Sequence, residues 1–247
     1  ILNHILARDG EKIDNVEQAL ERAKKNGVKE LIVQPTHLMK GKEYDELKAT
    51  LDKHKASFEK LELAEPLLGK VGKDADKERV ANLIVQATVT GGGFDSVQKA
   101  AQDGVAFVFL GHGTSHTAAI SYSEMQSAMK KLGYANVFIG TVEGEPEETA
   151  VGAVIDAVKK GGYKKVTIRP MMVVAGDHAH NDMAGAEDDS WVQQFLNSKN
   201  FDRIETQIEG LGGVYDIQKL YAEHTQAAIN AANTAAEETT AAETKAN

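Results

Sequence analysis

Segments with helical and strand-like patterns alternate along almost the entire chain, and this alternation restricts the fold more than any other feature. A helix is predicted to begin at Asp14, which would form a capping box with Glu17, and to end at Asn26. The short apolar run Leu31–Val33 follows and stops near Pro35, as a buried parallel strand does. Further strands are predicted at 61–63, 105–110, 136–139, 165–169 and 204–208, and further helices at 43–54, 75–85, 96–101, 121–132, 147–160, 189–196 and 215–231. Because such alternation gives parallel sheets covered on both faces, the sequence predicts an α/β fold of the doubly wound, Rossmann-like type.

The length of 247 residues allows two domains of about 120 residues each. The glycine-rich run Thr90–Gly93 is predicted to be a hinge, which gives an N-terminal half at 1–90 and a C-terminal half at 91–213. Residues 234–247 are rich in alanine, threonine and glutamate and lack apolar periodicity, so we expect a disordered tail.

The composition limits the partners and cofactors of the chain. It contains no cysteine, which excludes disulfides, thiolate metal sites, iron–sulfur clusters and a cysteine nucleophile, so any metal must be held by nitrogen and oxygen ligands. A net charge of −9 gives no electrostatic reason to bind nucleic acid or an anionic membrane. No apolar run approaches the roughly 20 residues that span a bilayer. We expect a cytoplasmic protein; because residue 1 is Ile1 and the native start is not visible, a periplasmic location stays open.

Side chains that could bind a metal ion or transfer a proton lie in the loops that follow three predicted strands. His112 lies between two glycines after the strand at 105–110, Glu143 follows the strand at 136–139, and His178 lies in the loop after the strand at 165–169. Because parallel strands place their carboxyl ends at one edge of a sheet, these three side chains are expected to converge there. The arrangement predicts a site for a divalent metal, since imidazole and carboxylate groups suit such ions.

The sequence around His178 does not settle which histidine of this loop is the ligand or which carboxylate orients it. His180 would share a side with His178 if the segment is extended, so spacing alone does not choose between the two histidines as the ligand. Either Asp177 or Asp182 could hold the imidazole in place by accepting a hydrogen bond from it.

Other readings compete with a metal site at these positions. His116 would share a helical face with His112, and together with Glu143 the pair would suit a zinc-dependent hydrolase. Glu43 is equally an ordinary acid in the first turn of a helix, and His37 is equally a core histidine beside a proline.

The segments that carry these residues resemble the anaerobic sirohydrochlorin cobaltochelatases. The resemblance rests on Gly111–His116, Gly140–Pro146, Met172–Ala184, Asp188–Trp191 and Pro35–Tyr44, and it extends from about residue 5 to residue 230. The run Ala-Gly-Asp-His-Ala-x-Asn-Asp-Met within the third segment is its most specific part, whereas Gly-His-Gly-Thr alone is weakly specific.

The resemblance implies a class II chelatase fold, with two similar α/β halves, a cleft between them and a C-terminal helix, here 214–233, that packs back on the first half. It implies insertion of Co²⁺ into sirohydrochlorin in anaerobic cobalamin biosynthesis, with Fe²⁺, Ni²⁺ or Zn²⁺ as other ions for the same site and no organic cofactor. It also implies roles for single residues: His112, His178 and Glu43 as catalytic residues; His112, Glu143 and His178 as metal ligands; and His37, Gly111, Gly113 and Thr114 at the substrate.

Several expectations accompany this resemblance. Members of the family usually open with an apolar strand, a turn and a helix, whereas residue 1 already falls after that strand and turn. We therefore expect a fragment, or a chain that has lost its start, whose first sheet lacks a central strand.

Lys40, Lys42 and Arg169 are candidate anchors for the carboxylates of the tetrapyrrole. A haem- or metal-binding protein without catalytic turnover is the alternative function, and homo-oligomerisation stays open.

Overall fold

The computed structural model describes residues 2–246, with side chains from 5 to 234, and the chain divides into two compact units. The first unit contains the residues up to Pro35, the segment Lys42–Glu65 and the chain from Ala222 on, whereas the second contains Thr36–Gly41 and Pro66–Tyr221. Both units contain a parallel sheet with helices, which confirms the predicted α/β class.

The first unit is built on a pair of short parallel strands. Strands β1 (Glu30–Val33) and β2 (Lys60–Leu63) pair with Leu31 opposite Leu61. Its helices are α1 (Leu2–Asp9), α2 (Val16–Lys25) and α3 (Lys42–His54), followed by a 3₁₀ turn η1 (Lys55–Ser57). The small core of this unit contains Leu20, Leu51, Phe58 and Leu61.

The helix α2 begins one residue later than the capping box predicted at Asp14 and Glu17. The side chain of Asn15 accepts a hydrogen bond from the backbone N–H of Gln18 at 2.9 Å, and the Gln18 side chain accepts one from the Asn15 N–H at 3.1 Å. Asp14 instead pairs with Arg22 at 3.0 Å. Asn15 and Gln18 thus form the capping box that was predicted for two acids, one residue further along the chain.

The second unit carries a four-stranded parallel sheet in the order β4-β3-β5-β6. Its strands are β3 (Val105–Gly111), β4 (Val137–Thr141), β5 (Lys165–Pro170) and β6 (Arg203–Thr206). Its α-helices are α4 (Ala75–Gly91), α5 (Val97–Gln102), α6 (Ile120–Lys131), α7 (Val151–Lys160) and α8 (Trp191–Asn197). Short helical turns are η2 (Thr117–Ala119), η3 (Glu147–Thr149), the π-helical η4 (Ala179–Met183) and η5 (Leu211–Gly213).

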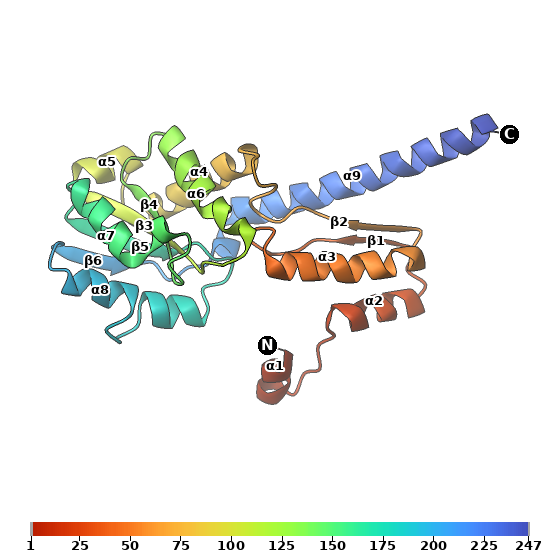
Figure 1. The fold of residues 1–247 in the computed structure, drawn as a ribbon, viewed down its shortest axis with the longest axis horizontal. Helices are drawn as coiled ribbons and strands as arrows, with labels where there is room; N and C mark the ends of the chain where they lie inside the picture. The colour runs from red at the N-terminus through yellow and green to blue at the C-terminus, as the bar shows by residue number, and fades with distance from the viewer. Residues whose placement is uncertain (1, 247) are drawn as a thin grey trace. The chain divides into compact units, whose positions relative to one another are not determined.

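Every residue of β3 is buried, because helices cover both faces of the sheet (Figure 1). Phe107 and Phe109 point into the core shared with α4 and α6, whereas Val108 and Leu110 point into the core shared with α7 and α8. This alternation explains why the sequence of β3 is apolar throughout rather than at every second position.

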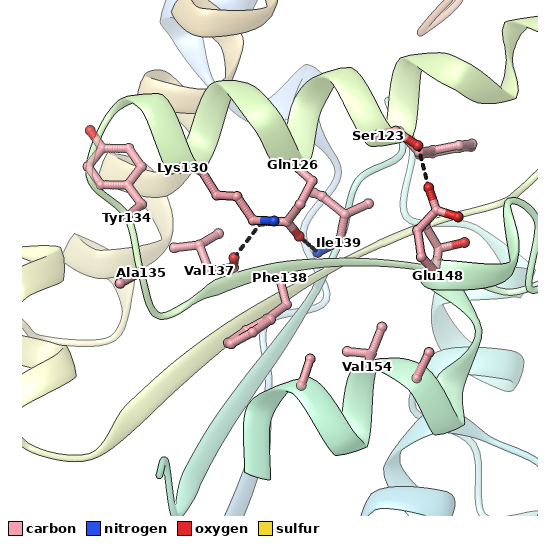
Figure 2. Close-up of a pocket in the computed structure, with 14 residues that line it drawn as sticks. Ser123, Gln126, Lys130, Tyr134, Ala135, Val137, Phe138, Ile139, Glu148 and Val154 are labelled. Carbon is pink, nitrogen blue, oxygen red and sulfur yellow. Dashed lines mark hydrogen bonds between the residues drawn. The ribbon is translucent and has the colours of Figure 1, made fainter. Parts of the chain in front are cut away.

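The outer edge of β4 is closed by a side chain instead of a further strand. Figure 2 shows Gln126 of α6 lying along this edge, where its Nε2 donates to the carbonyl of Val137 at 2.9 Å and its Oε1 accepts from the N–H of Ile139 at 2.8 Å. A cavity of about 350 Å³ lies beside it, between α6, β4 and α7. Because Gln126 satisfies backbone groups that a neighbouring strand would pair, it protects an edge that could otherwise recruit another chain.

Residues 90 and 91, between which the sequence predicts the boundary, both lie in the second unit, within Pro66–Tyr221. The helix α4 belongs to the second unit, because Val80, Ile84 and Val85 are fully buried in the core around β3. The predicted hinge Thr90–Gly93 is only partly a break: α4 continues through Gly91, and its hydrogen bonding ends at Gly92.

The last helix, α9 (Tyr215–Ala246), takes part in both units. Ile217 and Leu220 are buried in the second unit, whereas Thr225 in the first unit donates to the Gln34 side chain at 2.8 Å. The backbone is helical past the predicted end at 233, since alanine and glutamate favour helix. Side chains beyond 234 lie outside the described part, and the expectation of a disordered tail stays a prediction there. Among the described helices, none is both long and apolar enough to cross a bilayer.

Gly140 in β4 is required by a single large side chain. A Cβ built at Gly140 would lie 2.2 Å from the Trp191 ring, and Trp191 is 3% exposed, as expected for a ring packed on the sheet. We expect Gly140→Ala to lower the free energy of unfolding by about 1–3 kcal/mol, measured by chemical denaturation. Gly152→Ala is the matched control, because a Cβ there meets nothing within 4 Å. Equal stability of Gly140→Ala and the wild type would contradict this packing.

Candidate functional site

The strand order places a binding edge at the end of β3. β3 pairs with β4 on one side and with β5 on the other, so the connections from β3 to β4 and from β4 to β5 run in opposite directions across the sheet. Parallel sheets bind ligands outside the carboxyl ends of the strands, at the point where the order reverses. His112 follows the last residue of β3 directly and therefore lies at this point.

His112 and His178 meet at this edge, as the sequence predicts. Their Nε2 atoms are 3.1 Å apart, and the two rings are nearly perpendicular, with centroids separated by 4.4 Å and an interplanar angle of 82°. The side chain of His112 is 45% exposed and that of His178 is 50% exposed, so a ligand can reach both rings.

Each imidazole is held at its other nitrogen by an acceptor. The Nδ1 of His178 contacts Oδ2 of Asp182 at 2.5 Å, and the Nδ1 of His112 lies 3.0 Å from the Gly113 carbonyl and 3.5 Å from Oε1 of Glu143. An acceptor at Nδ1 favours the tautomer in which Nδ1 carries the proton. The lone pairs on both Nε2 atoms then face each other, which is unfavourable unless a proton or a metal ion lies between them.

The backbone around His112 is fixed by the extension of the sheet beyond β3 and β4. The N–H of Val142 donates to the Gly111 carbonyl at 3.0 Å, and that of Glu143 donates to the His112 carbonyl at 3.0 Å. Gly113 has a φ of 93°, and a Cβ there would lie 2.9 Å from the Cβ of Glu143. Only glycine meets both demands, because other residues rarely adopt this φ and would also displace Glu143.

The backbone around His178 is held by a π-helical turn rather than by the sheet. His178 directly precedes the π-helical turn η4 (Ala179–Met183), whose Ala179 and Met183 are buried against the sheet. This turn brings Asp182 back to His178, and it points His180 elsewhere, with its Nδ1 3.0 Å from the Gly176 carbonyl. The structure thus places His178, and not His180, beside His112, with Asp182 rather than Asp177 as the partner of its imidazole. Single π-helical turns are frequent at functional sites.

The spacing of the two Nε2 atoms matches that of two ligands of one metal ion. Nitrogens about 2.0–2.1 Å from an ion lie about 2.8–3.4 Å apart when they bind at right angles or at the tetrahedral angle. The observed 3.1 Å falls within this range. Among the described residues, no group of three or more His, Asp or Glu side chains is arranged to hold a metal ion. Glu143, the predicted third ligand, approaches the Nδ1 side of His112 rather than the Nε2 side.

Comparison with known proteins identifies the family. The sequence model of the family described as cobalt chelatase (CbiK) matches residues 1–230. The chain belongs to this cobalt chelatase family. It is 30% identical over 232 residues to a sirohydrochlorin cobaltochelatase of Salmonella typhimurium, covering 94% of this chain and 81% of that protein. It is also 30% identical over 193 residues to the sirohydrochlorin cobaltochelatase CbiKC of Nitratidesulfovibrio vulgaris, covering 77% of this chain and 63% of that protein.

A solved structure supports the chelatase fold. The sirohydrochlorin chelatase SirB from Bacillus subtilis subspecies spizizenii, crystallised in complex with cobalt, superposes with a TM-score of 0.50 and 14% sequence identity. The likeness covers 87% of this chain and 76% of that one. At this identity it supports the fold and not the details of the site.

His116 and Thr114 shape the loop after His112. His116 does not join His112 on a helical face: its Nδ1 accepts from the Ala118 N–H at 3.1 Å and caps η2. Thr114 accepts from the His116 N–H at 3.1 Å, and so shapes the loop after His112. The zinc-hydrolase set of His112, His116 and Glu143 is therefore not assembled in this structure, because residues 112–116 form a loop and not a helix.

His37 and Glu43 fall in different units. His37 lies in the second unit, where its carbonyl accepts from the Leu67 N–H at 3.1 Å and from the Tyr221 hydroxyl at 3.0 Å. Glu43 lies in the first unit, exposed in the first turn of α3. A catalytic role for Glu43 and a substrate contact for His37 stay predictions.

Tyr122 supports the site and is absent from the sequence prediction. Its hydroxyl accepts from the Gly113 N–H at 3.0 Å, and its ring fills the space where a Cβ at Gly111 would lie, 2.3 Å away. Burial raises the pKa of Tyr122, so the hydroxyl stays neutral while it accepts the hydrogen bond from the loop backbone. In the sequence Tyr122 is one of many residues on a predicted helix, and nothing marks its partner nine positions earlier.

Proposed function

We propose that this protein is a sirohydrochlorin cobaltochelatase, which inserts Co²⁺ into sirohydrochlorin with release of two pyrrole protons. The observation that carries the proposal is the pair of Nε2 atoms of His112 and His178, 3.1 Å apart at the switch point of the sheet. Membership of the cobalt chelatase family and the names of the relatives at 30% identity support the choice of metal and macrocycle.

The histidine pair suits delivery of a metal rather than its storage. Two imidazoles bind Co²⁺ without the strong retention that thiolates give, and half-exposed rings leave coordination positions for the macrocycle. As the ion moves to the pyrrole nitrogens, each Nε2 regains a free lone pair. These lone pairs can accept the protons that leave the pyrrole nitrogens, as general bases do.

The carboxylates would assist this transfer. Asp182 and Glu143 stabilise the Nδ1–H of their histidines and keep both Nε2 atoms directed at the metal. We propose that Glu143 becomes a further metal ligand by turning from the Nδ1 of His112 toward the ion. Glu43 is proposed as a proton acceptor from the first unit.

The test is turnover by the wild-type protein. Metal-free sirohydrochlorin and Co²⁺ are mixed with a small amount of the protein, and the absorbance of the free macrocycle is followed over many equivalents. A chelatase consumes macrocycle well beyond one equivalent, faster than the reaction without protein. A spectral change that stops at one equivalent would instead show a binding protein without turnover. Repeating the assay with Fe²⁺, Ni²⁺ and Zn²⁺ tests which ion the site prefers.

A further inference from the structure

A second cavity lies beside the loop that carries His178. It has a volume of about 820 Å³ and is lined by Arg169, by Val173–Ala175 and by the segment from Glu209 to Val214. All of these residues belong to the second unit. Its walls are largely apolar, and it contains one buried cation, the guanidinium of Arg169.

Arg169 is deeply buried but poorly partnered. The residue is 2% exposed, and its Nε is buried without a hydrogen-bond partner in the described part of the chain. Its Nη1 donates to Gln207 at 3.2 Å and, more weakly, to Thr88 at 3.4 Å. Burial lowers the pKa of Arg169, and the nearby Glu209 offsets this only in part. Because an arginine side chain stays charged in proteins, this site has a positive charge in need of an anion.

The present counterion of Arg169 is easily displaced. Oε2 of Glu209 lies 3.3 Å from Nη2, but the Glu209 side chain is 73% exposed. The exposed Glu209 carboxylate can turn into solvent when a second anion takes its place, because the buried guanidinium then stays paired. Glu209 is therefore a counterion of Arg169 that an anionic ligand in the cavity can replace.

The cavity wall is tied to the loop of the histidine pair. The N–H groups of Leu211 and Gly212 donate to the carbonyls of Met172 and Val173 at 2.8 and 2.9 Å. A Cβ at Gly210 would lie 2.5 Å from the Val173 carbonyl oxygen, so this close contact requires glycine. Ala175 in the wall precedes His178 by three residues, which limits their Cα separation to about 11 Å. The wall of the cavity therefore continues directly into the loop that carries His178.

We propose that Arg169 binds a carboxylate of the tetrapyrrole substrate, which displaces Glu209 when the macrocycle lies over His112 and His178. This inference rests on the proposed function. A guanidinium donates two parallel hydrogen bonds to a carboxylate, which suits an acidic side chain of the macrocycle. Val173 and Val214 provide apolar surface for the methylene groups of that side chain. A local cation is needed because the chain as a whole carries a net charge of −9, which repels a polyanionic substrate.

The test measures the affinity of the full chain for metal-free sirohydrochlorin by absorbance titration. Arg169→Met keeps most of the side-chain volume and removes the charge, and it should raise Kd about 10- to 100-fold. The KM for sirohydrochlorin should rise in the same way with kcat little changed, because the contact is equally present before and during the reaction. The matched control is Arg203→Met at the opposite end of the sheet, where Arg203 is exposed and pairs with Glu205. This control should bind sirohydrochlorin as the wild type does.

A second variant tests the proposal independently of the folding of Arg169→Met. Glu209→Gln removes the competing carboxylate and should tighten binding several-fold, whereas Glu205→Gln should have no effect. If wild-type protein binds and metallates sirohydrochlorin while a folded Arg169→Met variant binds equally well, the assignment of Arg169 is overturned and the proposed function stands. Should Arg169→Met fail to fold, unchanged or weaker binding by Glu209→Gln overturns the assignment. Absence of both binding and turnover in the wild type would overturn the proposed function itself.

Discussion

Replacing His112 or His178 with alanine is expected to lower the rate of cobalt insertion by about 10²- to 10⁴-fold, because each change would remove a proposed metal ligand and proton acceptor at once. Both side chains are about half exposed, so neither change should alter the free energy of unfolding by more than about 0.5 kcal/mol. The double variant should lose little more than either single one, since the two Nε2 atoms act on one ion as a unit. Multiple-turnover assays with Co²⁺ and sirohydrochlorin, with denaturation curves for each variant, measure both quantities.

His180→Ala is the matched control for this experiment. His180 lies on the same turn as His178, but its Nδ1 contacts the Gly176 carbonyl and not the pair of His112 and His178. It should keep most of the wild-type rate. Wild-type turnover in both His112→Ala and His178→Ala would refute the assignment of the pair, and a loss confined to His180→Ala would move the site to the other histidine of the loop.

The convergence of His112 and His178 at one edge of the sheet could be predicted because it depends mainly on topology. The apolar run of β3 and the proline-terminated run of β5 mark buried parallel strands, and parallel strands end at one edge. His112 follows β3 directly, whereas His178 lies eight residues after Pro170, so the topology brings the loop of His178 to this edge and the loop itself completes the approach. The same reasoning places Glu143 beside His112, since β3 and β4 are neighbours in the sheet.

Details that depend on loop conformation could not be predicted from spacing. The π-helical η4 decides between Asp177 and Asp182 as the partner of His178, and such turns have no clear sequence signature. Glu143 lies close to Gly113 and to Nδ1 of His112, and the positive φ of Gly113 that allows this approach is permitted but not specified by the Gly-His-Gly motif. Contacts between residues far apart in the sequence could not be predicted either. Arg169 donates to Thr88, 81 positions earlier, because α4 packs on the sheet of the second unit.

Asp182→Asn is expected to reduce the affinity of the protein for Co²⁺, and with it the rate of insertion, by about 10- to 100-fold. The carboxylate lies 2.5 Å from Nδ1 of His178, where its charge strengthens the Nδ1–H hydrogen bond and directs the Nε2 lone pair toward His112. An amide can still accept from Nδ1–H, but it lacks the charge and can also turn its NH₂ group toward the ring. Titration of the protein with Co²⁺ alone measures this effect apart from catalysis.

The neighbouring acid provides the decisive comparison. Asp177→Asn removes the same charge from the same loop, next to His178 in sequence, yet Asp177 is exposed and lies outside the η4 turn that brings Asp182 to the ring. If proximity of negative charge were sufficient, both variants would weaken cobalt binding equally. If the contact with Nδ1 is what matters, only Asp182→Asn weakens it. Equal losses would therefore reject the orienting role of Asp182 and leave a general electrostatic attraction of the acidic loop for divalent ions.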